Sequence, residues 1–199
     1  ADIVVHSLTN DTVKSIAKGD SVAIKNDAST TVAKNAAMSA PVKKDATVTV
    51  ANQDPDVDIT KSFERSALVS GQSTTAEIIA TVGAQNVQTL QITEPSANQP
   101  NFTAQGLTFD GFGSGLEWPE GATSAKIEYT YSDGTTSAVT TTTVHTLGAP
   151  TAGRTVEGFR ITFTADGDDI PSRAYATLPL KVTALPVTTA AAHSGTNHV

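Results

Sequence analysis

Short segments in which apolar and polar residues alternate recur along this chain. Residues 46–50 read Ala-Thr-Val-Thr-Val, and residues 127–131 read Ile-Glu-Tyr-Thr-Tyr. A period of two places every second side chain on the same face, which is typical of a strand with one buried face. Similar segments lie around residues 57–63, 75–82, 87–92, 159–163 and 176–182. Their number and short spacing predict an all-β protein built from antiparallel β-sandwiches.

The charge and the residue types exclude several classes of function. The chain has 20 Asp and Glu against 13 Lys and Arg, a formal net charge of −7, and no Cys. Binding to nucleic-acid phosphates requires clustered Lys and Arg, so we expect no nucleic-acid partner. Without Cys there are no disulfides, thiolate metal sites or Cys nucleophiles. No apolar run approaches the roughly 20 residues of a spanning helix, so we expect no membrane span in this chain.

A polar break at residues 52–56, Asn-Gln-Asp-Pro-Asp, separates two series of strand-like segments. Residues 32–39 resemble residues 187–194, which suggests an internal repeat. We therefore interpret residues 1–53 as the C-terminal part of one repeat and residues 54–199 as a second repeat. The second copy ends before a counterpart of the last strand of the first copy. The chain is then either a part of a longer array or a subunit that borrows a strand to cover an open edge.

One part of the sequence resembles a known family. Residues 56–63, Asp-Val-Asp-Ile-Thr-Lys-Ser-Phe, are followed by residues 69–76, Val-Ser-Gly-Gln-Ser-Thr-Thr-Ala. This order resembles the opening of DUF11-like immunoglobulin-like repeats of bacterial and archaeal cell-surface proteins. The resemblance extends to residues 176–185 but not to residues 95–119, which we expect to be an insertion or a long loop. It implies immunoglobulin-like antiparallel β-sandwich repeats, an extracellular location at the cell surface, and a spacer or adhesive role.

Lys61 occupies an unusual position in the pattern. It falls between Ile59 and Phe63 on the apolar face of a predicted strand, where an unpaired ammonium group is costly to bury. One interpretation is an intramolecular isopeptide bond from Lys61 to an Asn or Asp on the last strand, assisted by a buried acid. That last strand has no counterpart in the second repeat, and Asn52, near the last strand of the first, has no matching Lys. The alternative is that Lys61 snorkels, with its stem packed and its amine in water.

An acidic segment at the predicted joint between repeats contains oxygen ligands of the kind that calcium prefers. Asp54, Asp56 and Asp58 alternate with other residues there. A calcium ion at this joint would stiffen an array, but the spacing is not that of an EF-hand loop. The alternative is a solvated linker, and we expect no other cofactor.

Residues 110–119, Asp-Gly-Phe-Gly-Ser-Gly-Leu-Glu-Trp-Pro, form a Gly-rich segment. The segment lacks the strand-then-helix context and the Lys of a phosphate-binding loop. We expect a tight connection in which Phe112 and Trp118 close one end of the sandwich. The alternative is a ligand-contact loop in which Trp118 binds a sugar of a host or cell-wall glycan.

No nucleophile-elbow motif is present, and no pair of carboxylates has a spacing that favours a glycosidase, so we expect the chain not to be an enzyme. Our leading hypothesis is a non-catalytic structural repeat of a bacterial cell-surface adhesin or stalk protein. Its partners would be neighbouring repeats or identical subunits. The alternatives are a subunit of an extracellular filament or sheath assembled by β-strand donation, and a carbohydrate-binding module.

Overall fold

The computed structural model describes residues 21–30, 33–34, 37–38, 42–51, 55–167 and 170–186. The chain divides into two compact units, Ala1–Asp54 and Pro55–Val199, and the division falls within the polar break of the sequence. In the described residues every regular element is a β-strand. No helix in this part of the chain is long and apolar enough to cross a membrane. The described part of the protein is therefore all-β, as the sequence predicted.

The described part of the first unit consists of two antiparallel strand pairs. The long strands β1 (Ser21–Thr30) and β4 (Val42–Ala51) pair along their whole length. The short strands β2 (Ala33–Lys34) and β3 (Ala37–Met38) pair with each other. Thr47 and Thr49 of β4 are exposed, as expected for the polar positions of the alternating pattern.

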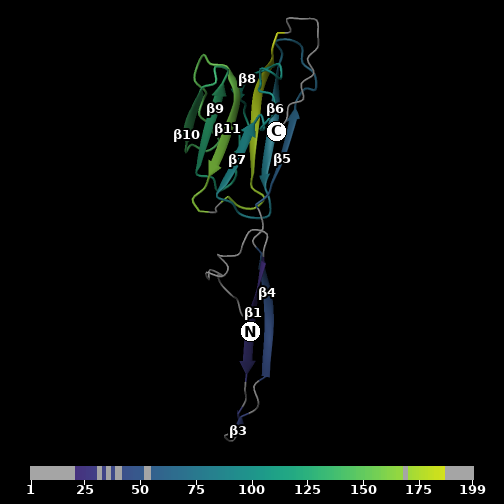
Figure 1. The fold of residues 1–199 in the computed structure, drawn as a ribbon, viewed down its shortest axis with the longest axis vertical. Helices are drawn as coiled ribbons and strands as arrows, with labels where there is room; N and C mark the ends of the chain where they lie inside the picture. The colour runs from purple at the N-terminus through teal and green to yellow at the C-terminus, as the bar shows by residue number, and fades with distance from the viewer. Residues whose placement is uncertain are drawn as a thin grey trace. The chain divides into compact units, whose positions relative to one another are not determined.

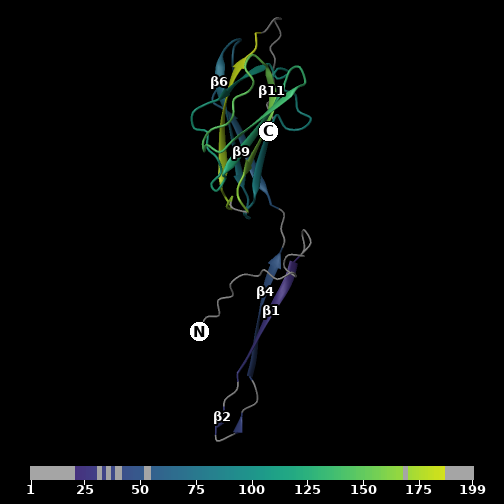
Figure 2. The same cartoon turned by 90° about the vertical axis from the view of Figure 1, so that its left-hand side faces the viewer.

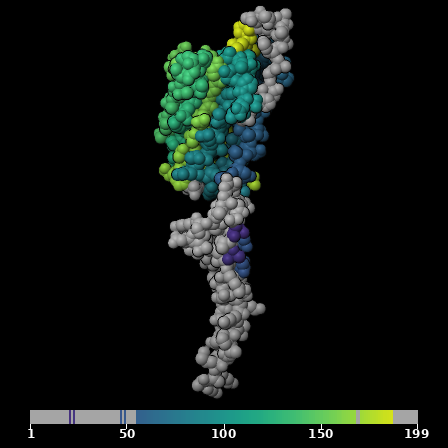
Figure 3. Space-filling model, in the orientation of Figure 1, coloured from purple at the N-terminus to yellow at the C-terminus, as the bar shows by residue number. Residues whose placement is uncertain are grey.

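The second unit is a sandwich of two four-stranded antiparallel sheets (Figures 1 and 2). One sheet has the strand order β5-β6-β12-β8 and the other has the order β10-β9-β11-β7. Figure 3 draws the same unit in space-filling form, with β9 and β10 in green and β5 in blue. The bounds are β5 (Val57–Phe63), β6 (Ser73–Val82), β7 (Thr89–Glu94), β8 (Leu107–Phe112), β9 (Ser124–Tyr131), β10 (Thr136–Thr141), β11 (Val156–Thr164) and β12 (Tyr175–Ala184).

The alternating residues of the sequence form the core between these sheets. On β6, every second residue from Ala76 to Val82 is apolar and is fully or almost fully buried. On β9 and β11, the same holds for Ile127 and Tyr129 and for Ile161 and Phe163. Removal of this apolar surface from water is the main favourable contribution to folding.

The expectation that residues 95–119 form an insertion or a long loop was wrong in one part. Residues 107–112 form β8, which pairs with β12 and completes one sheet. The register between β8 and β12 shifts between Lys181 and Val182, which indicates a β-bulge next to Gly111. The bulge adds a residue, so Phe109 and Phe112 both contact the core although they differ in parity. A search for strict alternation therefore misses this strand.

The strands β5 and β7 are edge strands of the two sheets. Among the described strands, only β6 pairs with β5. Figure 1 shows β5 at one side of the unit. This open side of the sandwich contains two charged residues, Lys61 and Glu94.

Candidate functional site

A buried ion pair joins the two sheets at the open side of the sandwich. Lys61 lies on β5 opposite Ile78, and Glu94 is the last residue of β7, opposite Phe159. Nζ of Lys61 lies 2.7 Å from Oε1 of Glu94 and donates a hydrogen bond to it. The two side chains are only 5% and 0% exposed. The pair therefore bridges the two edge strands at the margin of the core, with both side chains shielded from water.

The environment of Lys61 shifts its protonation equilibrium. Burial disfavours the charged ammonium group and lowers the pKa of Lys61 from its ordinary value of 10.5, whereas the charge of Glu94 and the hydrogen bond to it act in the opposite direction. Because burial has the larger effect, Lys61 is held closer to the neutral amine than it would be in water. The ring of Phe63, with its centroid 5.9 Å from Nζ, adds a weak cation–π attraction.

The structure bears on the snorkelling interpretation of Lys61 but does not test the isopeptide bond. The amine is not in water, so Lys61 does not snorkel. A buried acid, which the isopeptide interpretation requires, is present at hydrogen-bond distance. The covalent bond itself stays a prediction.

Sequence reasoning did not identify Glu94, although a signal for it exists. Leu90 and Ile92 are buried on the inner face of β7, and Glu94 follows at the same parity. A carboxylate on the apolar parity of one strand and a lysine on the apolar parity of another indicate a buried pair. The sequence does not show that these two strands face each other.

The backbone around Glu94 is held by a close approach of β11. At Gly158, a Cβ atom would lie 2.9 Å from the carbonyl oxygen of Glu94 and 3.1 Å from Cδ of Pro95. We expect the Gly158→Ala variant to be less stable by about 1–3 kcal/mol, because backbone has to move to make room. Urea titration followed by the fluorescence of Trp118, the single Trp of the chain, measures this change.

Gly113→Ala is the matched control for this substitution. A Cβ atom at Gly113 would make ordinary contacts of 3.5–3.6 Å with Pro179 and Lys181. We therefore expect a clearly smaller loss than for Gly158→Ala. Equal losses in the two variants would contradict the close approach of β11 to Glu94.

Two of the three residues predicted as calcium ligands, Asp56 and Asp58, lie at the start of the second unit. Asp54 is outside the described residues, and Asp58 is exposed on β5. Asp56 precedes β5, and its Oδ1 accepts a hydrogen bond of 3.3 Å from the N–H of Ala84. Among the described residues, no three His, Asp or Glu side chains are grouped so that they could hold a metal ion. The calcium site stays a prediction without support from the described geometry.

The predicted ligand-contact residues Phe112 and Trp118 pack against the core. Trp118 is 5% exposed, and its indole N–H donates a hydrogen bond of 3.0 Å to the carbonyl oxygen of Thr146. Its ring meets Phe163 edge-to-face at a centroid distance of 5.7 Å. Phe112 meets Phe109 in the same way at 5.3 Å. A sugar could stack on Trp118 only after the ring had left this position. The contacts of Phe112 and Trp118 agree with a role in closing the sandwich, and the ligand-contact hypothesis stays a prediction.

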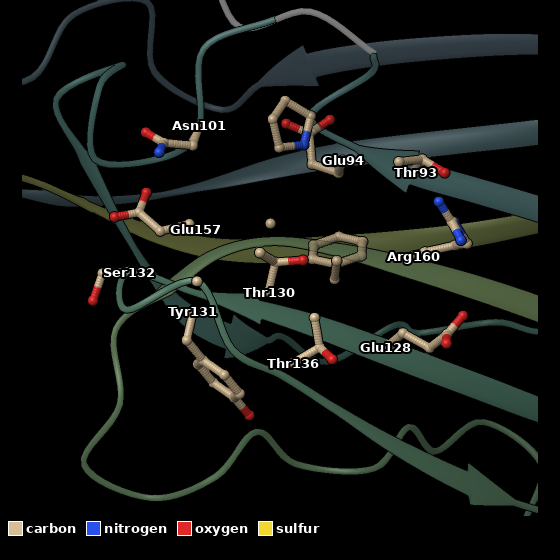
Figure 4. Close-up of a pocket in the computed structure, with 14 residues that line it drawn as sticks. Thr93, Glu94, Asn101, Glu128, Thr130, Tyr131, Ser132, Thr136, Glu157 and Arg160 are labelled. Atoms are coloured by element: carbon tan, nitrogen blue, oxygen red, sulfur yellow. The ribbon is translucent and has the colours of Figure 1, made fainter. Parts of the chain in front are cut away.

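A surface hollow lies next to the ion pair, over the ends of β7, β9 and β11. Figure 4 shows Arg160 and Glu128 at one side of the hollow, and Glu157 with Asn101 at the other. The carboxylate of Glu157 accepts a hydrogen bond of 3.2 Å from the N–H of Thr103, so it has a structural role. The described residues that line the hollow include no His, Cys or Lys. We therefore assign no chemistry to this surface.

Comparison of the chain with protein-family models, with curated proteins and with solved structures returned no match. The resemblance to DUF11-like repeats therefore stays a prediction from the sequence. Function has to be inferred from the fold of the second unit and from the Lys61–Glu94 pair.

Proposed function

We propose that this chain is a non-catalytic structural repeat of a bacterial cell-surface adhesin or stalk protein. Its role is mechanical: it holds a binding region away from the cell. Its partners are neighbouring repeats or identical subunits, and its location is extracellular.

The path of the chain through the second unit is the observation that carries this proposal. β5 and β12 both pair antiparallel with β6, so they run parallel to each other. The chain therefore begins β5 at one end of the sheet and leaves β12 at the opposite end. Tension between these two ends loads the β5–β6 and β6–β12 ladders in shear, so that many hydrogen bonds must break together. This arrangement suits a domain that transmits force.

The core of the second unit supports the same function. It is continuous between the sheets and contains five neighbouring aromatic rings, those of Phe102, Phe109, Phe112, Tyr129 and Phe159. A close-packed core of this kind resists deformation. It suits a spacer better than an element that has to open around a ligand.

The location can be tested on intact cells that produce the protein. A biotin reagent that does not cross membranes should label lysines such as Lys126, whose side chain is 49% exposed, before the cells are lysed. A cytoplasmic protein of the same cells serves as the negative control. Labelling that occurs only after lysis would contradict the proposal.

The second candidate function, a filament subunit assembled by strand donation, is favoured by the edge of β5. Val57 is 54% exposed and Ile59 is 39% exposed on this strand. An edge strand with exposed apolar side chains is a template for pairing with another strand. We expect a filament subunit to form oligomers in a sizing experiment, and the double variant Val57→Lys, Ile59→Lys to abolish them.

Val139→Lys is the control for the filament experiment. Val139 is 37% exposed, close to the value for Ile59, but lies on β10. The oligomers should persist in this variant. A wild-type chain that is monomeric at all concentrations would rule out the filament function and leave the stalk repeat.

A further inference from the structure

A second surface hollow lies at the start of β12 and has a volume of about 510 Å³. It shares no lining residue with the hollow next to the ion pair. Its lining includes Glu117, Glu120, His145, Arg173 and Tyr175. We propose that this hollow, the Tyr175 hollow, binds one neutral pyranose ring of a glycan, with the sugar stacked on Tyr175. The inference goes beyond the mechanical role, and its test uses the purified chain, wherever the protein is located.

Tyr175 provides an aromatic surface that is open to solvent. It is the first residue of β12 and is 50% exposed, whereas the next residue, Ala176, is fully buried, so Tyr175 lies on the outer face of the sheet. Every other aromatic side chain of the chain is buried or half-buried. The C–H face of a pyranose ring is apolar and packs against an aromatic ring, while its hydroxyl groups stay free for hydrogen bonds. Tyr175 is therefore the one place in this protein where a sugar can stack without a change in the fold.

The Tyr175 hollow also contains hydrogen-bonding groups that the fold leaves unused. Among the described residues, the side chains of Glu117, Glu120 and Arg173 take part in no ion pair or hydrogen bond. In the hollow next to the ion pair, by contrast, Glu157 accepts a hydrogen bond from the N–H of Thr103. The Tyr175 hollow thus keeps acceptors and donors available for a ligand.

These groups select the chemistry of the ligand. The two carboxylates accept hydrogen bonds, and the guanidinium group of Arg173 donates them. A hydroxyl group both donates and accepts, so a ring with several hydroxyl groups satisfies both kinds of partner. Carboxylates outnumber the guanidinium group, which disfavours a sulfated or phosphorylated ligand. A neutral sugar fits this set.

The fold places Glu117 and Tyr175 on the same face of the sheet. Glu117 forms an isolated β-bridge with Thr177, with N–H···O=C distances of 2.9 and 3.0 Å. Residues opposite each other in a bridge share a face, and Thr177 lies two residues after Tyr175 on the same strand. Neighbours on this diagonal are about 7–8 Å apart. A sugar ring stacked on Tyr175 is therefore within reach of the carboxylate of Glu117.

The backbone at the rim of the hollow is held in a costly conformation. Arg173 and His145 have φ angles of 69° and 61°, and they are two of the three non-glycine residues with positive φ in the described part of the chain. The N–H of Arg173 donates hydrogen bonds of 3.0 and 3.1 Å to the carbonyl oxygens of Val82 and Gly83. Residues in this conformation cluster at binding sites, where they fix side chains in place. Both of them line the Tyr175 hollow, which supports a binding role for it.

Trp118 forms part of the lining and can report on binding. It is 5% exposed, and the hydrogen bond of 3.0 Å to the carbonyl oxygen of Thr146 holds its ring in place. It is also the single Trp of the chain, so a sugar that displaces water next to it should change the protein fluorescence. The stacking role that the sequence suggested for Trp118 passes to Tyr175.

A glycan array tests the proposal. It carries neutral hexose and N-acetylhexosamine glycans beside sulfated glycans, and the neutral glycan with the strongest signal is then titrated as a soluble oligosaccharide while Trp118 fluorescence is followed. We expect saturable binding that is unchanged in about 0.5 M NaCl, because salt screens only charged contacts. No binding to any neutral glycan, or binding to sulfated glycans alone, would overturn the proposal. Binding that falls steeply with salt would identify a charged ligand and would overturn it as well.

Two variants of Tyr175 locate the site. Tyr175→Ala removes the stacking surface and should weaken binding about tenfold, whereas Tyr175→Phe keeps the ring and should bind nearly as the wild type does. Because Tyr175 is half-exposed, both variants should fold, and urea titration checks this. Tyr175→Ala that binds as tightly as the wild type would overturn the assignment to this hollow.

Arg173→Gly separates a binding role from a structural one. Glycine accepts the positive φ at no steric cost, so this variant should unfold at the urea concentration of the wild type or above it, and yet bind the oligosaccharide more weakly. Val69→Ala is the control, because Val69 is 66% exposed but lies outside the hollow, and its binding should be unchanged. Equal binding by Arg173→Gly and Val69→Ala would show that Arg173 does not contact the sugar.

Discussion

The Glu94→Leu variant is expected to be less stable to unfolding, by about 3–5 kcal/mol, than the double variant Lys61→Met, Glu94→Leu. In the single variant an ammonium group is left without its carboxylate at a site shielded from water, because the side chains of Lys61 and Glu94 are 5% and 0% exposed. In the double variant the same space holds apolar side chains, so no charge has to be buried. Glu94 is replaced by Leu in both variants, so their difference in stability comes from the side chain at position 61, and the charge is its main part. Urea titration at neutral pH provides both free energies of unfolding.

The exposed pair Lys126–Glu128 is the control for this comparison. Its Nζ–Oε1 distance is 3.1 Å, but the side chains are 49% and 37% exposed. Glu128→Leu and the double variant Lys126→Met, Glu128→Leu should differ by only about 0–1 kcal/mol, because water solvates an unpaired charge at the surface. If the difference at Lys61 were equally small, water would reach the pair, and the buried position of Lys61 would be refuted.

The Phe109→Ala variant is expected to lose about 3–5 kcal/mol of unfolding free energy. Phe109 is 6% exposed and lies among four other aromatic rings, with centroid distances of 5.5 Å to Phe102, 5.3 Å to Phe112, 6.4 Å to Tyr129 and 5.5 Å to Phe159. Removal of the ring loses its burial and leaves a cavity, because neighbouring strands relax only partly. Thermal and urea unfolding should both show the loss.

Tyr175→Ala is the control for the core variant. Tyr175 lies in the same sheet, as the first residue of β12, but it is 50% exposed. The change in free energy should be small, within about 0.5 kcal/mol, as for most surface substitutions. A Phe109→Ala variant as stable as Tyr175→Ala would show that β8 does not pack into the core as described.

The strands of the second unit could be predicted to different degrees, and the reason is visible in β8 and β9. The sequence of β9 alternates strictly from Ala125 to Tyr131, so both its strand state and its buried face followed from the period of two. The bulge of β8 next to Gly111 breaks that period, so this strand was mistaken for a loop. The local pattern is sufficient to predict a strand where one face is buried without interruption. It is not sufficient where an extra residue shifts the alternation.

The residues of the candidate site also differ in how far the sequence could predict them. Lys61 could be singled out because a lysine on the apolar parity of a strand needs a partner. Glu94 could not be selected among the acidic residues, because it is 33 residues away in sequence and its role depends on β7 facing β5. The roles considered for Asp56 and Trp118 depended on exposure, which a linear sequence does not contain. In the fold, Asp56 accepts a backbone hydrogen bond and Trp118 lies in the core.

The sequence by itself determined the all-β class, most strands of the second unit, and the positions at which a polar group would meet an apolar face. These properties are local, because the period of two and the turn residues act within a few neighbours. Only the tertiary structure decided which strands are edges, that β5 and β7 lie at the same open side, and that Lys61 pairs with Glu94. The physical reason is that alternation shows which side of a strand is buried. Which sheet the strand joins, and which strands lie beside it, depends on the packing of the whole domain.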